Sequence, residues 1–93
     1  MSSNVDIITL IKSDPQKAFA LIYDLHYADL CRASYRLVVD KDASEDVVQE
    51  VLMEFWNKRD QINISTSVIG YLKRSVYNRS INYIKSRSKF TDD

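Results

Sequence analysis

The sequence has very few of the residues that build reactive or tightly turned sites. Its 93 residues include one His, one Cys, one Gly and one Pro. These numbers exclude His/Cys metal clusters, a P-loop and a dinucleotide-binding fingerprint, each of which needs several such residues. The single Cys31 cannot form an internal disulfide, so nothing indicates an oxidising compartment. We therefore expect no enzyme active site, no metal and no cofactor.

Long apolar segments are absent as well. No apolar run approaches the roughly 18 residues of a membrane span, and the N-terminus lacks the basic start and long apolar stretch of a signal peptide. The scarcity of Gly and Pro favours long helices. A hydrophobic content of 45% suffices for one modest core. The composition predicts a single, soluble, cytoplasmic, all-α domain.

Acidic residues are missing from one part of the chain. Residues 61–91 contain six Lys or Arg and no Asp or Glu, whereas residues 1–60 carry eleven acidic and seven basic side chains. The formal net charge of zero hides this division. Such a division indicates two surfaces for two partners of opposite charge.

The first two of four expected helices follow from end signals and apolar spacing. A short helix should run from Asn4 to Ile11. Asp14 followed by Pro15 is a strong start signal for the second helix, which should extend to Val39. Its apolar residues recur every three or four positions and predict a buried stripe. The residues of this stripe are Phe19, Ile22, His26, Leu30, Ala33 and Leu37.

The third and fourth helices are separated by a polar, β-branched segment. Asp42 is the expected N-cap of the third helix, Ala43 to Arg59, with Glu45 in the capping-box position. Residues 60–67 are poor in helix formers and predict a loop, whose Ser65, Thr66 or Ser67 caps a fourth helix that ends near Arg87. We expect an ordered part of about residues 4–88, with a linker or frayed end after it. The core side of the fourth helix should hold Ile69, Leu72, Val76, Ser80 and Tyr83.

The opposite side of the fourth helix combines basic, amide and aromatic side chains. Lys and Arg bind phosphates, and Asn offers a donor and an acceptor to a base edge. Tyr71 provides a stacking plane for an unpaired base, and the hydroxyls and amides of the preceding loop suit an extruded base. We interpret this side as a nucleic-acid-binding stripe, although a solvated helix face has similar residues. Its members are Tyr71, Arg74, Ser75, Asn78, Asn82, Lys85 and Lys89.

The third helix has an acidic face that suits a protein partner. An ordinary solvated helix has a similar composition. However, Met53 lies amid the acidic residues and Trp56 follows at the end of the face, which favours a partner with a basic surface. The face consists of Asp46, Gln49, Glu50, Met53 and Glu54.

Three segments, in the right order, resemble the extracytoplasmic-function (ECF) sigma factors. The segment from Asp14-Pro15 through Phe19, Ile22, Tyr23 and Tyr27 resembles the family's first long helix. Residues 43–56 (Ala-Ser-Glu-Asp-Val-Val-Gln-Glu-Val-Leu-Met-Glu-Phe-Trp) are similar to its core-binding helix. Residues 71–84 resemble its promoter-binding helix and keep the family's spacing at Leu72, Arg74 and Asn78. The resemblance covers roughly residues 14–88.

This resemblance implies a sigma-two domain (region 2), a compact bundle of three long helices plus a short N-terminal helix. Such a domain binds core RNA polymerase and recognises and helps open the minus-ten promoter element in transcription initiation. The contact with the coiled coil of the largest polymerase subunit carries over onto Asp46, Gln49 and Glu50, with Glu54 as a weaker neighbour. An anti-sigma factor is a further candidate partner. The contact with the minus-ten non-template strand carries over onto Asn63, Ser65, Thr66, Ser67, Tyr71, Arg74, Asn78, Asn82 and Lys85.

The same resemblance leads us to expect a fragment of a longer protein. The family's helix-turn-helix domain for the minus-thirty-five element is missing, and its interdomain linker would begin near residues 89–93. Two other functions stay open: a small helical adaptor that binds proteins, and a module that reads duplex DNA. A pocket for one base before the fourth helix would favour the sigma function. A helix-turn-helix would favour the duplex reader, but no short turn joins two short helices in this sequence.

Overall fold

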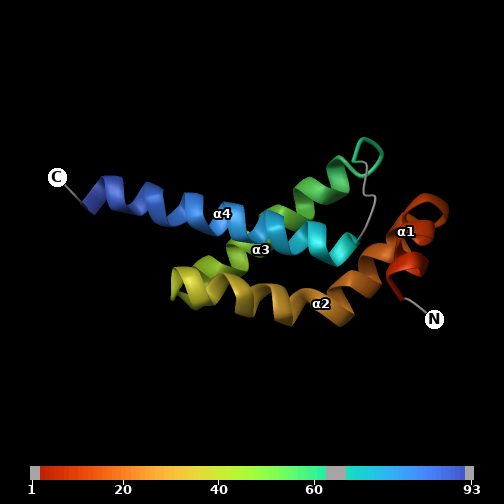
Figure 1. The fold of residues 1–93 in the computed structure, drawn as a ribbon, viewed down its shortest axis with the longest axis horizontal. Coiled ribbons are helices and arrows are strands. Elements are labelled where there is room, and N and C mark those ends of the chain that lie inside the picture. Colours follow the sequence, from red (N-terminus) through yellow and green to blue (C-terminus); the bar gives the residue numbers. More distant parts are fainter. Residues whose placement is uncertain (1–2, 63–66, 92–93) are drawn as a thin grey trace.

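The computed structural model describes the backbone of residues 3–62 and 67–91, and the side chains of residues 7–62 and 67–87. These residues form four helices and no strand, which confirms the all-α class with three long helices and a short first one (Figure 1). None of the described helices is both long and apolar enough to span a bilayer. The helices are α1 (Ser3–Ser13), α2 (Pro15–Val38), α3 (Lys41–Asn57) and α4 (Val68–Thr91).

Helix α2 begins and ends close to the predicted positions. The carboxylate of Asp14 accepts a hydrogen bond from the backbone N–H of Lys17 at 3.3 Å, and Pro15 occupies the first helical position. At the other end, Val39 adopts a left-handed conformation with φ 56°, and its N–H donates to the carbonyl of Tyr35. A β-branched residue is strained there, by roughly 1–3 kcal/mol. The strain accompanies a turn in which only Val39 and Asp40 separate α2 from α3.

The N-cap of α3 differs from the prediction. Asp40, not Asp42, caps the helix: its carboxylate accepts from the N–H of Ala43 at 3.0 Å, and its carbonyl accepts from the hydroxyl of Ser44 at 2.7 Å. The predicted capping box of Asp42 and Glu45 is therefore wrong. Starting the helix two residues earlier places Ala43 and Ser44 in the buried interior of the bundle. The helix also ends at Asn57 rather than at residue 59.

Helix α4 is capped as predicted but is longer. The hydroxyl oxygen of Ser67 accepts a hydrogen bond from the N–H of Gly70 at 3.0 Å, which selects Ser67 among the three predicted capping residues. Ser65 and Thr66 lie outside the described residues. The helix continues to Thr91 and does not end near Arg87, because no Gly or Pro follows Arg87 in the helix. Its last turns project beyond α2 and α3 (Figure 1).

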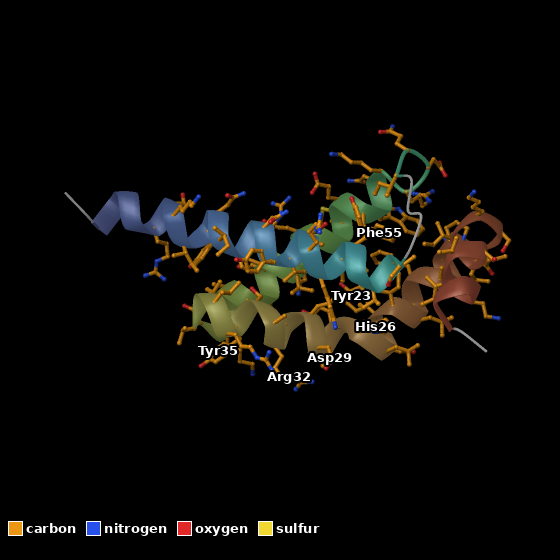
Figure 2. The ribbon with its side chains drawn as sticks, viewed as in Figure 1. Tyr23, His26, Asp29, Arg32, Tyr35 and Phe55 are labelled. Carbon is orange, nitrogen blue, oxygen red and sulfur yellow. The ribbon has the colours of Figure 1, made fainter. Side chains whose placement is uncertain are left out.

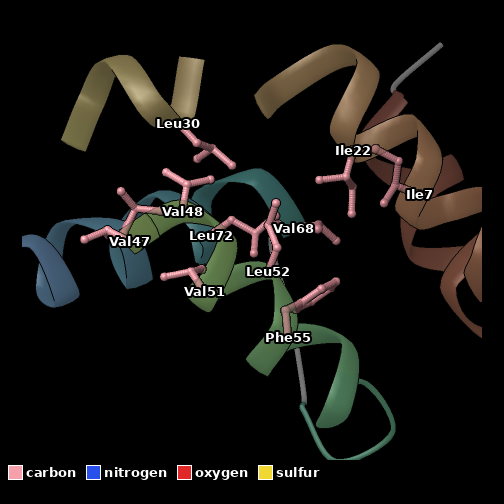
Figure 3. Packing of buried hydrophobic residues seen from close by; sticks show 11 residues of the cluster. Ile7, Ile22, Leu30, Val47, Val48, Val51, Leu52, Phe55, Val68 and Leu72 are labelled. Atoms are coloured by element: carbon pink, nitrogen blue, oxygen red, sulfur yellow. The ribbon is translucent and has the colours of Figure 1, made fainter. Parts of the chain in front are cut away.

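The core lies where α2, α3 and α4 meet, and α1 adds Ile7 at one end (Figure 3). Leu30, Val48 and Leu72, one from each long helix, are fully buried. The core side predicted for α4 is confirmed, with Ile69 and Tyr83 half-buried at its margins. The core residues are Ile7, Ile22, Leu30, Val47, Val48, Val51, Leu52, Phe55, Val68, Leu72 and Val76.

The stripe predicted for α2 is only partly right. Ile22 and Leu30 are fully buried, but the other four predicted members are half-buried. Ala18 and Ser34 are fully buried instead. Small side chains let α2 approach its neighbours closely, and hydropathy alone does not mark a serine as a core residue. The half-buried members are Phe19, His26, Ala33 and Leu37.

Candidate functional site

The acidic face of α3 and the polar stripe of α4 are neighbours along one groove. The two helices pack against each other, and the groove between them has a volume of about 510 Å³. Asn78 and Asn82 of the stripe and Glu50 and Glu54 of the face all line it. The two charged surfaces predicted from the sequence therefore meet at a shared edge. The groove is lined by Val47, Glu50, Val51, Glu54, Ser75, Asn78, Arg79, Asn82, Tyr83 and Ser86.

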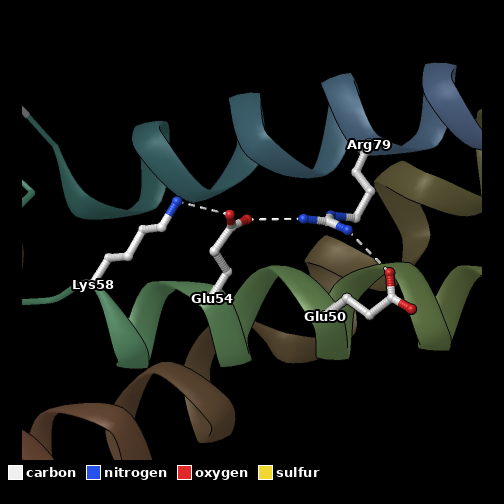
Figure 4. Close-up of polar contacts among 4 residues, drawn as sticks. All are labelled: Glu50, Glu54, Lys58 and Arg79. Carbon is white, nitrogen blue, oxygen red and sulfur yellow. Dashed lines mark hydrogen bonds and ion pairs between the residues drawn. The ribbon is translucent and has the colours of Figure 1, made fainter.

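Arg79 joins the two surfaces by binding two carboxylates of α3 (Figure 4). Its Nη1 lies 3.1 Å from Oε1 of Glu50, and its Nη2 lies 2.8 Å from Oε1 of Glu54. The second carboxylate oxygen of Glu54 accepts from Nζ of Lys58 at 3.1 Å. The hydrogen bonds from Lys58 and Arg79 lower the pKa of Glu54 below its ordinary value. Nothing in the sequence marks Arg79 for this role, because it belongs to neither the predicted core side nor the predicted stripe.

The four predicted polymerase-binding side chains are all exposed, but they divide between two grooves. Glu50 and Glu54 turn toward α4, as described above. Gln49 turns toward α2, where its Nε2 donates to the hydroxyl of Tyr27 at 3.2 Å. Asp46 is exposed on the same helix. Helix α3 thus presents polar groups to two adjoining surfaces of the bundle.

A second, mostly apolar groove of about 420 Å³ lies between α2 and α3. Phe19 and Trp56 meet edge-to-face across it with ring centroids 5.3 Å apart, and the Met53 side chain at its border is 63% exposed. The sequence indicated Met53 and Trp56 as contacts for a partner, but it gave no sign of the α2 wall. The groove is lined by Gln16, Phe19, Tyr23, Gln49, Leu52, Met53 and Trp56.

The predicted nucleic-acid-binding stripe lies on the outward side of α4. Arg74, Asn78, Asn82 and Lys85 are exposed, and Ser75 is half-buried beside them. The side chain of Lys89 is not among the described ones.

The start of α4 brings together the remaining described residues of the predicted DNA surface. Tyr71 is 36% exposed, and its ring packs at 6.0 Å from that of Phe55. Ser67 uses its hydroxyl oxygen in the helix cap. Asn63, Ser65 and Thr66 lie outside the described residues, as does the proposed pocket for one base.

Helix α1 and the end of α3 form the support for this end of α4. A small cavity of about 80 Å³ lies among them. Arg59 is fixed at its edge, because its guanidinium stacks 4.0 Å above the ring of Trp56 and donates to the Trp56 carbonyl. The cavity is lined by Ile8, Ile11, Lys12, Phe55, Arg59, Ile62 and Val68.

The outward side of α2 holds a local ion pair rather than a site (Figure 2). Arg32 donates to the carboxylate of Asp29 one turn earlier, and this hydrogen bond lowers the pKa of Asp29. Both side chains are largely solvent-exposed, so the pair contributes little to stability. His26, a member of the stripe predicted to be buried, is half-buried on the same helix.

Comparison with known proteins identifies the family. Residues 22–90 match the family model "Sigma-70 region 2", a segment that runs from within α2 almost to the end of α4. No curated protein and no solved structure gives a significant match. Region 2 domains are not enzymes; they act in transcription initiation by binding core RNA polymerase and promoter DNA. The match spans well over half of the chain, and the chain therefore belongs to the sigma-70 family as a region 2 domain.

Proposed function

We propose that this domain is region 2 of a bacterial ECF-type sigma factor. Helix α3 docks on the coiled coil of the largest polymerase subunit, and α4 with its preceding loop binds the non-template strand of the minus-ten element. The three ECF-like segments at residues 14–27, 43–56 and 71–84 support the ECF assignment within the family. Such a protein acts in the cytoplasm, and an anti-sigma factor is a further candidate partner.

The observation that carries this proposal is the two-sidedness of α4. Leu72 and Val76 are fully buried on one side, while Arg74, Asn78 and Lys85 are exposed on the other. The core therefore holds a row of cations and amides outward on a rigid helix. Such a row can contact phosphates and base edges without any rearrangement of the bundle.

On the DNA side, the loop and the start of α4 hold one unstacked base. Asn63 and residues 65–67 surround it, and Tyr71 stacks on it, while Asn82 and the exposed row of α4 contact the strand. Opening the duplex costs a few kcal/mol per base. A few phosphate contacts give only ~10⁻⁴–10⁻⁶ M non-specific binding at physiological salt. Capture of the base and docking on polymerase must therefore offset the cost of opening together.

On the polymerase side, Asp46, Gln49 and Glu50 supply the main polar contacts. Glu54 is the weaker contact, because both of its carboxylate oxygens are already engaged by Lys58 and Arg79. The adjoining apolar groove with the exposed Met53 adds a place for an apolar side chain of the partner.

The test is titration of the fluorescently labelled chain with core RNA polymerase. We expect saturable binding that Asp46→Arg abolishes and Gln49→Ala weakens. Asp24→Arg is the matched control, because it makes the same charge reversal at an exposed position of α2 instead of α3. An absence of core binding, or equal binding by the Asp46→Arg and Asp24→Arg variants, would contradict the proposal.

A further inference from the structure

Arg79 borders the candidate DNA surface, but its guanidinium is paired with carboxylates of α3. It lines the same groove as Asn78 and Asn82 of the nucleic-acid-binding stripe. Both terminal nitrogens of its guanidinium point to carboxylates, at 3.1 Å for Glu50 and 2.8 Å for Glu54. In the free domain, this cation of α4 is therefore neutralised.

The two donors of this contact, Nη1 and Nη2, are also the donors that Arg uses to bind phosphate. The fork of a guanidinium binds two oxygens at once, whether they belong to carboxylates or to a phosphate. The Arg79 side chain is 38% exposed, and those of Glu50 and Glu54 are 61% and 48% exposed. Ion pairs in such exposed positions are weak and can be exchanged at little cost. A phosphate that approaches α4 is thus a realistic competitor for Arg79.

The two carboxylates also belong to the face that we assign to polymerase. A cationic partner that binds Glu50 and Glu54 competes with Arg79 for the same oxygen atoms. Lys58 holds the other oxygen of Glu54 and can stay in place during this exchange. One guanidinium thus lies between two surfaces that are proposed to bind different partners.

We propose that Glu50 and Glu54 act as an internal substitute for DNA phosphate on Arg79, and that binding of a cationic partner to these carboxylates frees Arg79 for a phosphate of the bound strand. This inference rests on the proposed function, which assigns polymerase to α3 and DNA to α4. It makes Arg79 a DNA contact of the polymerase-bound protein and a self-neutralised residue in the free one.

The first experiment measures binding of the whole chain to fluorescein-labelled single-stranded DNA by anisotropy over a range of salt concentrations. The Glu50→Gln/Glu54→Gln variant should bind about two- to fivefold more tightly, the range expected when a weak exposed pair no longer competes. Its plot of log K against log salt should be steeper by about 0.7, the value for one more phosphate contact on a single strand. The matched control, Asp42→Asn/Glu45→Gln, removes the same charge from α3 outside the bridge and should leave the slope unchanged.

The second experiment tests whether the tighter DNA binding of the Glu50→Gln/Glu54→Gln variant depends on Arg79. Adding Arg79→Gln to the double variant should remove the extra slope. Arg79→Gln alone should change binding by the free chain less than about 1.5-fold, but should weaken binding by the core-bound chain two- to fivefold. Circular dichroism checks that all variants keep the native helix content.

Two results would overturn this inference. One is an equal increase in DNA affinity in the Asp42→Asn/Glu45→Gln control. The other is an increase in DNA affinity that persists when Arg79→Gln is added to the Glu50→Gln/Glu54→Gln variant. Either result would mean that the removed charges act at long range and not through Arg79. A chain that binds neither single-stranded DNA nor core polymerase would instead contradict the proposed function itself. The two kinds of failure are therefore distinguishable.

Discussion

The hydroxyl oxygen of Ser34 on α2 lies 2.7 Å from that of Ser80 on α4, and both side chains are fully buried. This hydrogen bond is a buried polar link between α2 and the helix that carries the candidate DNA surface. Two small side chains let the helices approach closely, and one hydroxyl donates a hydrogen bond to the other away from water. The pair therefore helps to set how α4 packs against α2.

Removing one hydroxyl of this pair should cost more than removing both. Ser80→Ala leaves the buried Ser34 hydroxyl without its partner, which should lower the free energy of unfolding by about 1–3 kcal/mol. In Ser34→Ala/Ser80→Ala, no polar group is left unsatisfied, so the total loss should stay below about 1 kcal/mol. Urea unfolding measures both values. A double variant at least as unstable as the sum of the single variants would show that the hydroxyls do not depend on each other.

The cap of α3 can be tested in the same way. Asp40→Ala should lower the free energy of unfolding by about 0.5–2 kcal/mol, because the N–H of Ala43 loses its acceptor. Asp40→Asn is the control and should be nearly neutral, since Asn caps equally well. Asp42→Ala should cost less than Asp40→Ala. If Asp42→Ala lowers the free energy of unfolding more than Asp40→Ala does in urea unfolding, Asp42 and not Asp40 is the cap.

The start of α3 could not be predicted correctly from the sequence. Asp40 and Asp42 are both good caps by residue type, and the pattern favoured Asp42 because Glu45 follows three residues later. The actual start was decided by packing, which buries Ala43 and Ser44. The start of α2 was predictable because Asp14 and Pro15 act locally and agree with each other.

Two stripe residues should have different effects on DNA binding. Asn78→Ala removes a base-reading group and should relax the preference among single-stranded sequences. Lys85→Ala removes a phosphate contact and should weaken binding to all sequences about equally. The slope of log K against log salt should fall by about 0.7. Anisotropy with a panel of oligonucleotides measures both. Loss of sequence preference in the Lys85 variant alone would reverse the two assignments.

The ion pairs of Glu54 should make a small, pH-dependent contribution to stability. The hydrogen bonds from Lys58 and Arg79 lower its pKa in the folded state below the ordinary value of 4.5. The carboxylate therefore stabilises the fold above about pH 4.5. This contribution disappears as the pH falls through the lowered folded-state value.

The stability difference between the wild type and Glu54→Gln shows this effect. It should be at most about 1 kcal/mol at pH 7, as for other exposed pairs. Urea unfolding at several pH values should show that difference shrinking toward zero in acid. A difference that grows as the pH falls below 4.5 would contradict the assigned pKa direction.

The two sides of α4 show why some of the site was predictable and some was not. Leu72, Val76 and Ser80 follow the helical period, so the outward position of Arg74 and Asn78 followed from the sequence. The bridge of Arg79 did not, because it depends on which helix packs beside α4, and a single-helix pattern has no information about the neighbour.

The most direct test of the central claim measures binding of the chain to a labelled DNA single strand by anisotropy, with and without core polymerase. The single strand is first selected from a randomised pool by the core-bound chain. We predict weak binding by the chain alone, tighter binding with core than core alone achieves, and weaker binding of the matching duplex. Asp46→Arg should abolish the gain from core. Equal binding of single strand and duplex, or a gain unaffected by Asp46→Arg, would contradict the claim that α3 docks on polymerase while α4 holds the open strand.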